Sequence, residues 1–325
     1  MTIKKTVSVI ITGLNVQNTV DECIQSLLNL DYPKEDYEII YVDGGSTDNT
    51  LENISAYPIR IVKEQGGSPA SGRNTGIKKA RGEIIAFTDA DSIVDKNWLN
   101  KLLECYETSN VAGVGGVILP YPEKKYLPRT IGFLLPTNFG SAGARNPAIY
   151  STRRVVDHNP TNNASIRKSV LSEVGYFNEE LKVAEDIELD LRIIKYGYKL
   201  VYTPEAKVWH RQRQELGCFI LQMFNYGFWR AWAGKKYRGL LQLKHLIPSL
   251  FLLFIVGGAI LSFTNLQGIL LLFSVTLLAY FCVGLITGFK VSLESKEASH
   301  ILSIPILGFI EHVSYGLGII RGLLK

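Results

Sequence analysis

The chain of 325 residues is long enough for about two domains of ordinary size. Hydrophobic residues make up 46% of it and charged residues 20%, with 29 Gly and 12 Pro, which excludes a disordered chain, a collagen and a small disulfide-rich scaffold. Lysine and arginine total 35 against 30 for aspartate and glutamate, and a net charge of +5 is too small an excess to indicate nucleic-acid binding.

Short apolar, β-branched runs alternate with segments of helical periodicity in the first part of the chain. This alternation predicts an α/β fold with a Rossmann-like, doubly wound, mostly parallel sheet. Such sheets bind their ligands beyond the carboxyl ends of the strands. Strands are expected at 7–12, 38–42, 59–62, 83–88 and 199–203, and helices at 19–30, 46–54, 71–80, 95–106 and from 184 onward.

Acidic residues follow two of these strands. Asp43 comes directly after 38–42, and Asp89 and Asp91 follow 83–88. Two carboxylates separated by one residue can share a hard divalent cation, which would bridge a substrate diphosphate. Asp43 can accept hydrogen bonds from a nucleobase N–H or from ribose hydroxyls. For each acid the alternative is an ordinary turn or helix cap, because aspartate is common in both.

A glycine-rich turn could bind phosphate. Gly66-Gly67-Ser68-Pro69, followed by Arg73, can bring backbone N–H groups and a guanidinium close to an anion. The P-loop pattern and the dinucleotide-binding glycine pattern are both absent from the sequence. The sequence therefore favours a nucleotide-diphosphate site over an ATPase or an NAD-dependent enzyme.

The segment 184–192, Ala-Glu-Asp-Ile-Glu-Leu-Asp-Leu-Arg, begins a helix with more acids than capping requires. One carboxylate here could accept the proton of an attacking hydroxyl, although attraction to the positive end of the helix dipole also explains some of these acids. After the strand 199–203, His210 could be a third metal ligand, and Arg211 and Arg213 could neutralise a departing diphosphate. The alternatives are a structural histidine and positive charge that faces a membrane.

The C-terminal part is apolar. Between Lys244 and Lys290 lie 45 residues without an acidic residue, a lysine or an arginine, enough for two membrane crossings of about 20 residues each. We expect spans near 246–263 and 267–289, separated by Thr-Asn-Leu-Gln at 264–267.

A third apolar run, 301–320, carries Glu311 and His312 in its middle. It is either a third span that faces its neighbours or a helix that lies in the membrane interface.

Basic residues precede the first span, and the turn between the two spans contains none. The positive-inside rule then places residues 244 and 290 on the cytoplasmic side of a multi-pass cell-membrane protein. The strand-like run close after Met1 argues against a signal peptide, so the front domain is expected in the cytoplasm. The expected organisation is a soluble domain at 1–215, an amphipathic interface segment at 216–244 and a membrane domain at 245–325.

These pieces occur in the order of a known family. Over about residues 5–235 the chain resembles the family 2 glycosyltransferases of the GT-A fold, with a membrane anchor at the C-terminus. The resemblance is carried by seven motifs in sequence: Val-Ser-Val-Ile-Ile-Thr-Gly-Leu-Asn at 7–15, Val-Asp-Gly-Gly-Ser-Thr-Asp-Asn-Thr at 42–50, Gly-Arg-Asn-Thr-Gly at 72–76, Thr-Asp-Ala-Asp-Ser at 88–92, Asn-Asn-Ala-Ser-Ile-Arg at 162–167, Glu-Asp-Ile-Glu-Leu at 185–189 and His210.

The resemblance implies an inverting reaction. The acceptor hydroxyl would attack the anomeric carbon of a UDP- or GDP-sugar once, Asp186 would take its proton, and Mg²⁺ or Mn²⁺ would stabilise the leaving diphosphate. The implied metal ligands are Asp89 and Asp91, with His210 assisting, and Glu185 and Asn163 would lie near the acceptor or the sugar. Together with the arginines above, the expected nucleotide-sugar-binding residues are Thr12, Asn15, Asp43, Arg73, Asp89, Arg211 and Arg213.

Two departures from the family pattern narrow the expected function. Many members read Asp-Asp-Gly-Ser where this chain has Asp-Gly-Gly-Ser at 43–46, so the usual second carboxylate is missing. The Q-x-x-R-W signature of processive polysaccharide synthases is absent from 210–216, which disfavours the extrusion of a long polymer. The stretch 222–231 is similar to that of succinoglycan-type transferases, which extend a lipid-linked saccharide at the cytoplasmic membrane face.

The expected function is therefore transfer of one sugar from a nucleotide-sugar donor to a lipid-linked, polyprenyl-type acceptor at the membrane. A polyprenyl-phosphate monosaccharide transferase, a polysaccharide synthase subunit and a non-catalytic scaffold remain alternatives. The identity of the donor and the oligomeric state are not defined by the sequence.

Overall fold

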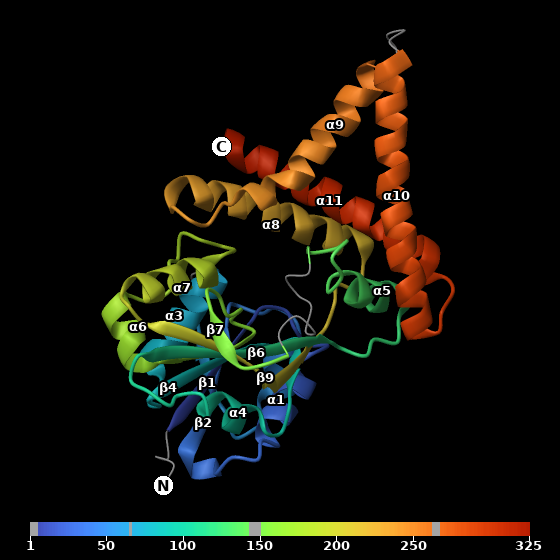
Figure 1. The fold of residues 1–325 in the computed structure, drawn as a ribbon. Helices are drawn as coiled ribbons and strands as arrows, with labels where there is room; N and C mark the ends of the chain where they lie inside the picture. Colours follow the sequence, from blue (N-terminus) through green and yellow to red (C-terminus); the bar gives the residue numbers. More distant parts are fainter. Residues whose placement is uncertain (1–5, 65–66, 143–150, 262–266) are drawn as a thin grey trace. The chain divides into compact units, whose positions relative to one another are not determined.

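The computed structural model describes residues 6–64, 67–142, 151–261 and 267–325 (Figure 1). Its contacts divide the chain into two compact units. The first comprises residues 1–121 and 150–211, and the second comprises 122–149 and 212–325. Each unit has hydrophobic core residues of its own. The segment 122–149 thus groups with the C-terminal helices, and the expected boundaries at 215 and 244 stay predictions.

Within the described residues, the first unit is built on a sheet of nine strands. They are β1 (Val7–Gly13), β2 (Tyr37–Asp43), β3 (Arg60–Lys63), β4 (Ile84–Asp89), β5 (Ser92–Val94), β6 (Val111–Pro120), β7 (Arg154–Val156), β8 (Asn163–Arg167) and β9 (Lys199–His210). Their order is β3-β2-β1-β4-β8-β6-β9-β5, with β7 also paired to β9. The four strands β3, β2, β1 and β4 are parallel, whereas β8 is antiparallel to both β4 and β6.

Helices cover both faces of this sheet (Figure 1). They are α1 (Val20–Leu28), α2 (Thr50–Ile54), α3 (Pro69–Lys79), α4 (Trp98–Leu103), α6 (Lys168–Val174) and α7 (Glu185–Lys195), with a short 3₁₀ helix, η1, at Lys34–Asp36. Ile24 of α1 and Trp98 of α4 are fully buried in one core, and Ile77 of α3, Leu171 of α6 and Ile193 of α7 are fully buried in the other. Burial of apolar surface on both faces explains the continuous apolar runs in β1 and β2.

The five expected strands and the five expected helices all occur, but the strand expected at 199–203 runs to His210, the helix expected at 46–54 begins at Thr50, and the helix expected at 95–106 covers only Trp98–Leu103. The structure adds β5, β6, β7 and β8, and each of these four has an antiparallel partner, so the sheet is mixed. The reason that β6 escapes detection is its glycine content: a Cβ at Gly115 would lie 2.3 Å from Oδ1 of Asn159, and one at Gly116 would lie 2.1 Å from the carbonyl oxygen of Ala206. Glycines inside a strand weaken its sequence pattern but permit such close packing.

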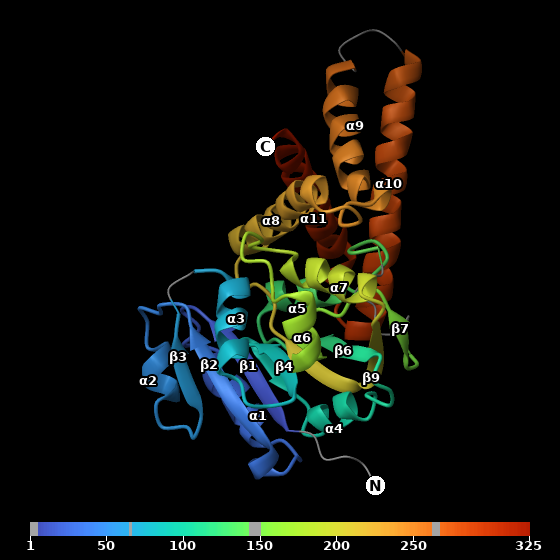
Figure 2. The same cartoon turned by 90° about the vertical axis from the view of Figure 1, so that its left-hand side faces the viewer.

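The second unit is helical. Its helices are α5 (Tyr126–Leu134), α8 (Leu216–Lys236), the 3₁₀ helix η3 (Leu243–Leu246), α9 (Ile247–Leu261), α10 (Gln267–Ser295) and α11 (His300–Leu324). The helices α9 and α10 (Figure 2) contact each other at Gly258 of α9, where an added Cβ would lie 2.2 Å from the ring of Phe273 in α10. The short helix α5 contacts α11 through a 2.8 Å hydrogen bond between the hydroxyls of Tyr126 and Ser303, and it reaches the turn before α11 through a 2.8 Å ion pair between Arg129 and Glu297.

In the part of the chain that the structure describes, three helical segments are long and apolar enough to cross a membrane by length and composition: Leu243–Leu261, Gly268–Ser295 and His300–Leu324. They differ in packing, because only 6% of the most apolar window in the second segment is buried, against 50% in the third. The first two segments thus leave an apolar surface for lipid, whereas half of α11 is covered by protein. Residues 262–266, which hold most of the expected break between the spans, lie outside the described residues.

Glycines allow α8 and α11 to approach closely. A Cβ at Gly227 of α8 would lie 2.1 Å from the carbonyl oxygen of Tyr315, and a Cβ at Gly318 of α11 would lie 2.1 Å from that of Phe224. Contacts of this kind between backbones are typical of small-residue helix interfaces in membranes. At Gly217, near the start of α8, an added Cβ would meet no atom of a neighbouring element within 4 Å.

We predict that Gly227→Ala destabilises the second unit while Gly217→Ala does not. Alanine at 227 forces the two helices apart, and overpacking of this kind costs about 1–3 kcal/mol. Alanine at 217 meets open space and raises helix propensity by up to about 1 kcal/mol. Thermal unfolding of the detergent-solubilised full chain measures the difference. Equal melting temperatures for the two variants would contradict the packing described for α8 and α11.

Candidate active site

Three neighbouring strands deliver polar residues to one edge of the sheet. In the register of the sheet, Gly13 of β1 lies opposite Asp43 of β2, and Thr12 of β1 lies opposite Asp89 of β4. All three strands are parallel, so their carboxyl ends meet at this edge. The structure therefore brings together Thr12, Asp43 and Asp89, which the sequence places far apart.

Asp43 organises the turn that follows β2. The residue is 2% exposed, and its carboxylate accepts hydrogen bonds from the backbone N–H groups of Gly45 and Ser46, each at 3.1 Å. Gly45 has a φ of +96°, which a residue with a side chain rarely adopts. Asn15, exposed after β1, joins the same turn by accepting a 2.9 Å hydrogen bond from Thr47 N–H. The turn is thus pre-formed, and the base-binding roles of Asp43 and Asn15 stay predictions.

Asp89, Asp91 and His210 form a cluster with metal-ligand chemistry. One ligand atom from each lies within 4.8 Å of the others. His210 reaches the acids because Ser92 of β5 pairs with His210 of β9, which leaves its Nε2 3.3 Å from Oδ1 of Asp91. Among the described residues, that buried Oδ1 accepts no hydrogen bond. Two carboxylates and an imidazole are suitable ligands for Mn²⁺ or a similar divalent cation, so the donor set fits a metal.

Arg73 links the cluster of Asp89, Asp91 and His210 to α7. Its guanidinium is buried: Nη1 lies 2.5 Å from Oε1 of Glu185, and Nη2 lies 3.5 Å from Oδ1 of Asp89. The ring of Phe177 lies 5.6 Å from the guanidinium carbon. The arginine that the sequence suggests for phosphate binding is therefore already engaged by two carboxylates. Burial raises the pKa of Asp89, and the positive charge of Arg73 acts in the opposite direction.

The two acids at the start of α7 have different environments. Ala184, with φ of 69°, precedes the helix and turns the chain into it. Glu185 is 6% exposed and faces Arg73, and burial raises its pKa to about 7 although Arg73 opposes the shift. The side chain of Asp186 is 20% exposed. Of the two adjacent carboxylates, Asp186 is thus the one that remains accessible to a substrate.

A histidine that no sequence motif indicates lies beside Asp186. His158 has its Nδ1 2.8 Å from Oδ2 of Asp190 and its Nε2 3.9 Å from Oδ2 of Asp186. Asp190 is 3% exposed, and burial raises its pKa while the hydrogen bond from His158 lowers it. The available sequence signal is the i, i+4 spacing of Asp186 and Asp190, which puts both on one face of a helix. The histidine itself gives no such signal, because it lies in a loop between β7 and β8.

The remaining arginines occupy different places. Arg211 contacts Oε2 of Glu22 at 2.5 Å, lies 3.9 Å above the ring of Tyr121, and donates its backbone N–H to the carbonyl oxygen of Asp91. Arg211 therefore lies next to the cluster of Asp89, Asp91 and His210. Arg213 is exposed and belongs to the second unit, so its part in diphosphate binding stays a prediction.

The side chain of Asn163 is buried between neighbouring strands and α4. The residue is fully buried, its Oδ1 accepts a 2.8 Å hydrogen bond from Trp98, and its amide nitrogen donates to the carbonyls of Val117 and Ala206. These hydrogen bonds tie β8 to β6, β9 and α4. The expected place of Asn163 near the acceptor or the sugar stays a prediction.

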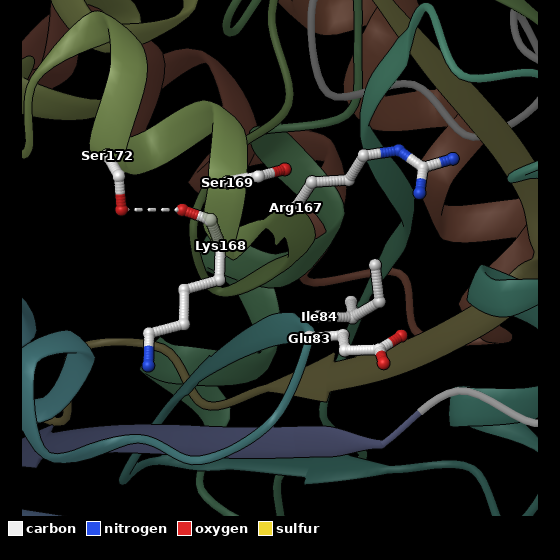
Figure 3. Close-up of a pocket in the computed structure, with 6 residues that line it drawn as sticks. All are labelled: Glu83, Ile84, Arg167, Lys168, Ser169 and Ser172. Atoms are coloured by element: carbon white, nitrogen blue, oxygen red, sulfur yellow. Dashed lines mark hydrogen bonds between the residues drawn. The ribbon is translucent and has the colours of Figure 1, made fainter.

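A cavity of about 420 Å³ lies at the opposite end of β4, at Ile84 (Figure 3). Its lining residues are Glu83, Ile84, Arg167, Lys168, Ser169 and Ser172. Lys168 donates to the carbonyl oxygen of Ala80, and Arg167 donates to those of Val111 and Thr108. Both cations are thus committed to backbone groups, and the acid cluster rather than this cavity is the candidate active site.

Comparison with known proteins places the chain among glycosyltransferases. The family model described as glycosyl transferase family 2 matches residues 8–175. A protein of Methanococcus voltae, named a dolichyl N-acetyl-α-D-glucosaminyl phosphate 3-β-D-2,3-diacetamido-2,3-dideoxy-β-D-glucuronosyltransferase, is 27% identical over 332 residues that cover 98% of this chain and 97% of that protein. Glycosyltransferase AglE of Haloferax volcanii is 30% identical, over 68% of this chain and 71% of its own length.

Among solved structures, a mannosyltransferase of Pyrobaculum calidifontis in complex with GDP-Man and Mn²⁺ matches with a TM-score of 0.69. The match covers 99% of this chain and 88% of that one at 18% sequence identity, which establishes a common fold. A structure of GalNAc-T7 with UDP, GalNAc and Mn²⁺ matches 65% of this chain and 44% of that chain, with a TM-score of 0.52 and 18% identity.

We predict that Glu185→Gln reduces the loss of stability as pH rises from about 5 to about 8. The folded pKa of Glu185, about 7, exceeds its ordinary value of 4.5. Its contribution to stability is therefore fully present below about pH 4.5 and is lost as pH rises through about 7. Melting temperatures at the two pH values, for wild type and variant, measure the difference. Glu188→Gln is the matched control, because Glu188 lies on the same helix and contacts Arg192. Equal pH responses of all three proteins would contradict the environment assigned to Glu185.

Proposed function

The chain belongs to glycosyl transferase family 2, and on this basis we propose that it moves one sugar from a UDP- or GDP-sugar to a lipid-linked glycan acceptor with inversion at the anomeric carbon. It has the GT-A fold. The observation that carries the proposal is the convergence of Asp89, Asp91, His210 and the start of α7 at the carboxyl edge of the sheet. The relative from M. voltae, which aligns along nearly the whole chain and is named for a dolichyl-linked acceptor, supports this acceptor class.

We assign the metal ligands to Asp89, Asp91 and His210. Their clustered ligand atoms and the buried Oδ1 of Asp91 support Mg²⁺ or Mn²⁺ as the cation, and Mn²⁺ is present in the matching mannosyltransferase structure. A divalent cation bound there would neutralise the negative charge that develops on the diphosphate as it leaves. Arg211, held beside Asp91, adds a guanidinium that can bind the same anion.

We assign the catalytic base to Asp186. The acceptor hydroxyl forms a bond to the anomeric carbon from the face opposite the diphosphate, the bond from that carbon to the diphosphate oxygen breaks, and the hydroxyl proton passes to the Asp186 carboxylate. Glu185 is unsuited to this part because its carboxylate is buried against Arg73. In the donor pocket, Asp43, Thr12 and Asn15 are assigned to the nucleoside.

We further propose that the protein is a multi-pass membrane protein with its catalytic domain in the cytoplasm. The two little-buried segments Leu243–Leu261 and Gly268–Ser295 would span the bilayer, and the basic residues before the first support this orientation. The half-buried helix α11 fits a helix in the membrane interface better than a third lipid-exposed span. An anchored catalytic domain meets a lipid-linked acceptor at high local concentration.

We predict that Asp186→Asn lowers sugar transfer by about 10²–10⁴-fold while donor binding is retained, because the variant keeps the shape of the side chain but cannot take the proton. The assay uses the full chain in nanodiscs with radiolabelled UDP-glucose, UDP-N-acetylglucosamine and GDP-mannose as donors. The acceptors are dolichyl phosphate and dolichyl phosphate-linked N-acetylglucosamine, which distinguish a lipid-phosphate transferase from one that extends a lipid-linked glycan. Glu188→Gln is the control. Undiminished transfer by Asp186→Asn would remove Asp186 from its role, and absence of transfer by the wild type from the whole panel would contradict the proposed function.

Metal removal should abolish this transfer. EDTA takes away the cation that the two aspartates hold, and added Mn²⁺ should restore activity. The variant Asp91→Asn should need a higher Mn²⁺ concentration, because it loses one anionic ligand. Glu83→Gln, at the other end of β4, is the matched control. Transfer that persists in excess EDTA would rule out a required metal ion.

A further inference from the structure

His158 connects the proposed base to a second, buried carboxylate. Its imidazole lies between two acids of α7, with Nδ1 2.8 Å from Oδ2 of Asp190 and Nε2 3.9 Å from Oδ2 of Asp186. Asp186 and Asp190 are separated by one helical turn, so a single planar ring in the adjacent loop faces both. His158 and Asp190 lie outside the seven sequence motifs, and the acid–imidazole–acid arrangement lies outside the cluster of Asp89, Asp91 and His210.

Hydrogen bonds of the neighbouring Asn159 fix the loop that carries His158. The backbone N–H of Asn159 donates a 2.8 Å hydrogen bond to the same Oδ2 of Asp190, and the side-chain amide of Asn159 donates to the carbonyl oxygen of Val201 in β9. Asn159 is 4% exposed and packs on Gly115 of β6, where no Cβ could be accommodated. The imidazole is therefore positioned by β6, β9 and α7 together.

The partners of the ring determine which nitrogen carries the proton. An ionised Asp190 is an acceptor only, so Nδ1 is the protonated nitrogen and Nε2 of the neutral ring is an acceptor. The Asp186 carboxylate that it faces is also an acceptor. Two acceptors at this separation attract each other only when a proton lies between them. The carboxylates of Asp186 and Asp190 on α7 are charged groups that face the imidazole, while β6 and β9 contact the neighbouring Asn159 through Gly115 and the Val201 carbonyl oxygen.

We propose that His158 is a positioning residue that receives the acceptor's proton from Asp186. This inference rests on the proposed role of Asp186 as the base. The acceptor O–H bond breaks as its oxygen bonds to the anomeric carbon, and the proton moves to Asp186. It then moves from Oδ2 of Asp186 to Nε2 of His158, which restores the carboxylate and leaves an imidazolium between two negative charges. Because the His158 side chain is 31% exposed, water takes the proton from the ring before the next turnover.

The contact of 3.9 Å between Nε2 and Oδ2 of Asp186 requires a small closure before the proton can pass. Hydrogen bonds of catalytic groups are often long in the absence of substrate and shorten in the complex. The burial of Asp190 makes the arrangement directional, since a buried carboxylate retains its hydrogen bond to Nδ1 and keeps Nε2 aimed at Asp186. Asp190 thus sets the tautomer, as the orienting acid does in other acid–imidazole pairs.

The test is the pH dependence of kcat for the full chain in nanodiscs, with the donor and acceptor of the panel above that the wild type uses best. In wild type, kcat should fall at acidic pH as the imidazole becomes protonated, because a protonated ring accepts no further proton. His158→Gln should lower the plateau of kcat by about 10–100-fold and move the acidic limb to lower pH, because the remaining base is a carboxylate. The donor Kd should be unchanged. Glu188→Gln removes a carboxylate from the same helix without facing the ring, and it should leave the limb in place.

Two further variants separate proton transfer from structural support. Imidazole added to His158→Ala should restore part of kcat, since the exposed site admits a small base, whereas a purely structural histidine would give no such rescue. Asp190→Asn should lower kcat more than it raises KM, because without the Asp190 carboxylate the proton of the His158 ring is no longer held on Nδ1. The position of a pH limb and rescue by imidazole are independent of the amount of folded enzyme, so both are readable from a partly folded preparation.

The outcomes distinguish the two proposals. Wild-type kcat and an unmoved acidic limb in His158→Gln, together with an inactive Asp186→Asn, would overturn the relay and leave the proposed function intact. Full activity of Asp186→Asn would remove the base on which the relay rests, whereas no transfer by the wild type would overturn the proposed function itself. Absence of imidazole rescue in a His158→Ala preparation that binds donor would also count against the relay.

Discussion

The geometry of the site depends on the ion pairs of the buried Arg73 guanidinium. Arg73 belongs to α3, contacts Glu185 at the start of α7, and faces Asp89 at the end of β4. Without it, two carboxylates would approach each other in the protein interior, and breaking such a buried pairing costs about 3–5 kcal/mol. The planar fork of arginine can serve two acids at once, which a lysine ammonium does less well. The end of β4, which carries the proposed metal ligand Asp89, and the start of α7, which carries the proposed base, are therefore held in one arrangement by a single side chain.

This arrangement separates the tasks of neighbouring acids. Glu185 is buried and paired with Arg73, whereas the adjacent Asp186 remains accessible and faces His158. On one side of the site, Asp89, Asp91 and His210 are suited to a cation that meets the leaving group. On the other side, Asp186, His158 and Asp190 are suited to the proton of the attacking group. Inversion requires these two chemistries on opposite faces of the sugar, and the division of the carboxylates between β4 and α7 is consistent with that requirement.

The second unit is packed through close contacts between helix backbones. Glycines at the contact between α8 and α11 let backbone approach backbone, so that α11 buries half of its most apolar window, while α10 leaves almost all of its window uncovered. In a bilayer, apolar side chains gain little from contact with each other, and close packing of small residues drives association instead. The helix α5, which comes between two strands of the first unit in the sequence, adds an ion pair to this helical unit through Arg129.

The sequence by itself determined the alternation of strands and helices, the apolar C-terminal part and the identity of the acids at strand ends, because these depend on local periodicity and on the rule that parallel strands end together. It did not determine β6 and β8, whose glycines and buried polar residues make sense only against Asn159, Ala206 and Trp98. Tertiary structure alone decided that Asn163 bonds to Trp98, Val117 and Ala206, that Arg73 is shared between two acids and that His158 faces Asp186. Each of these depends on residues far apart in the chain, and the direction of a side chain across such a distance is set by packing, which no local pattern encodes.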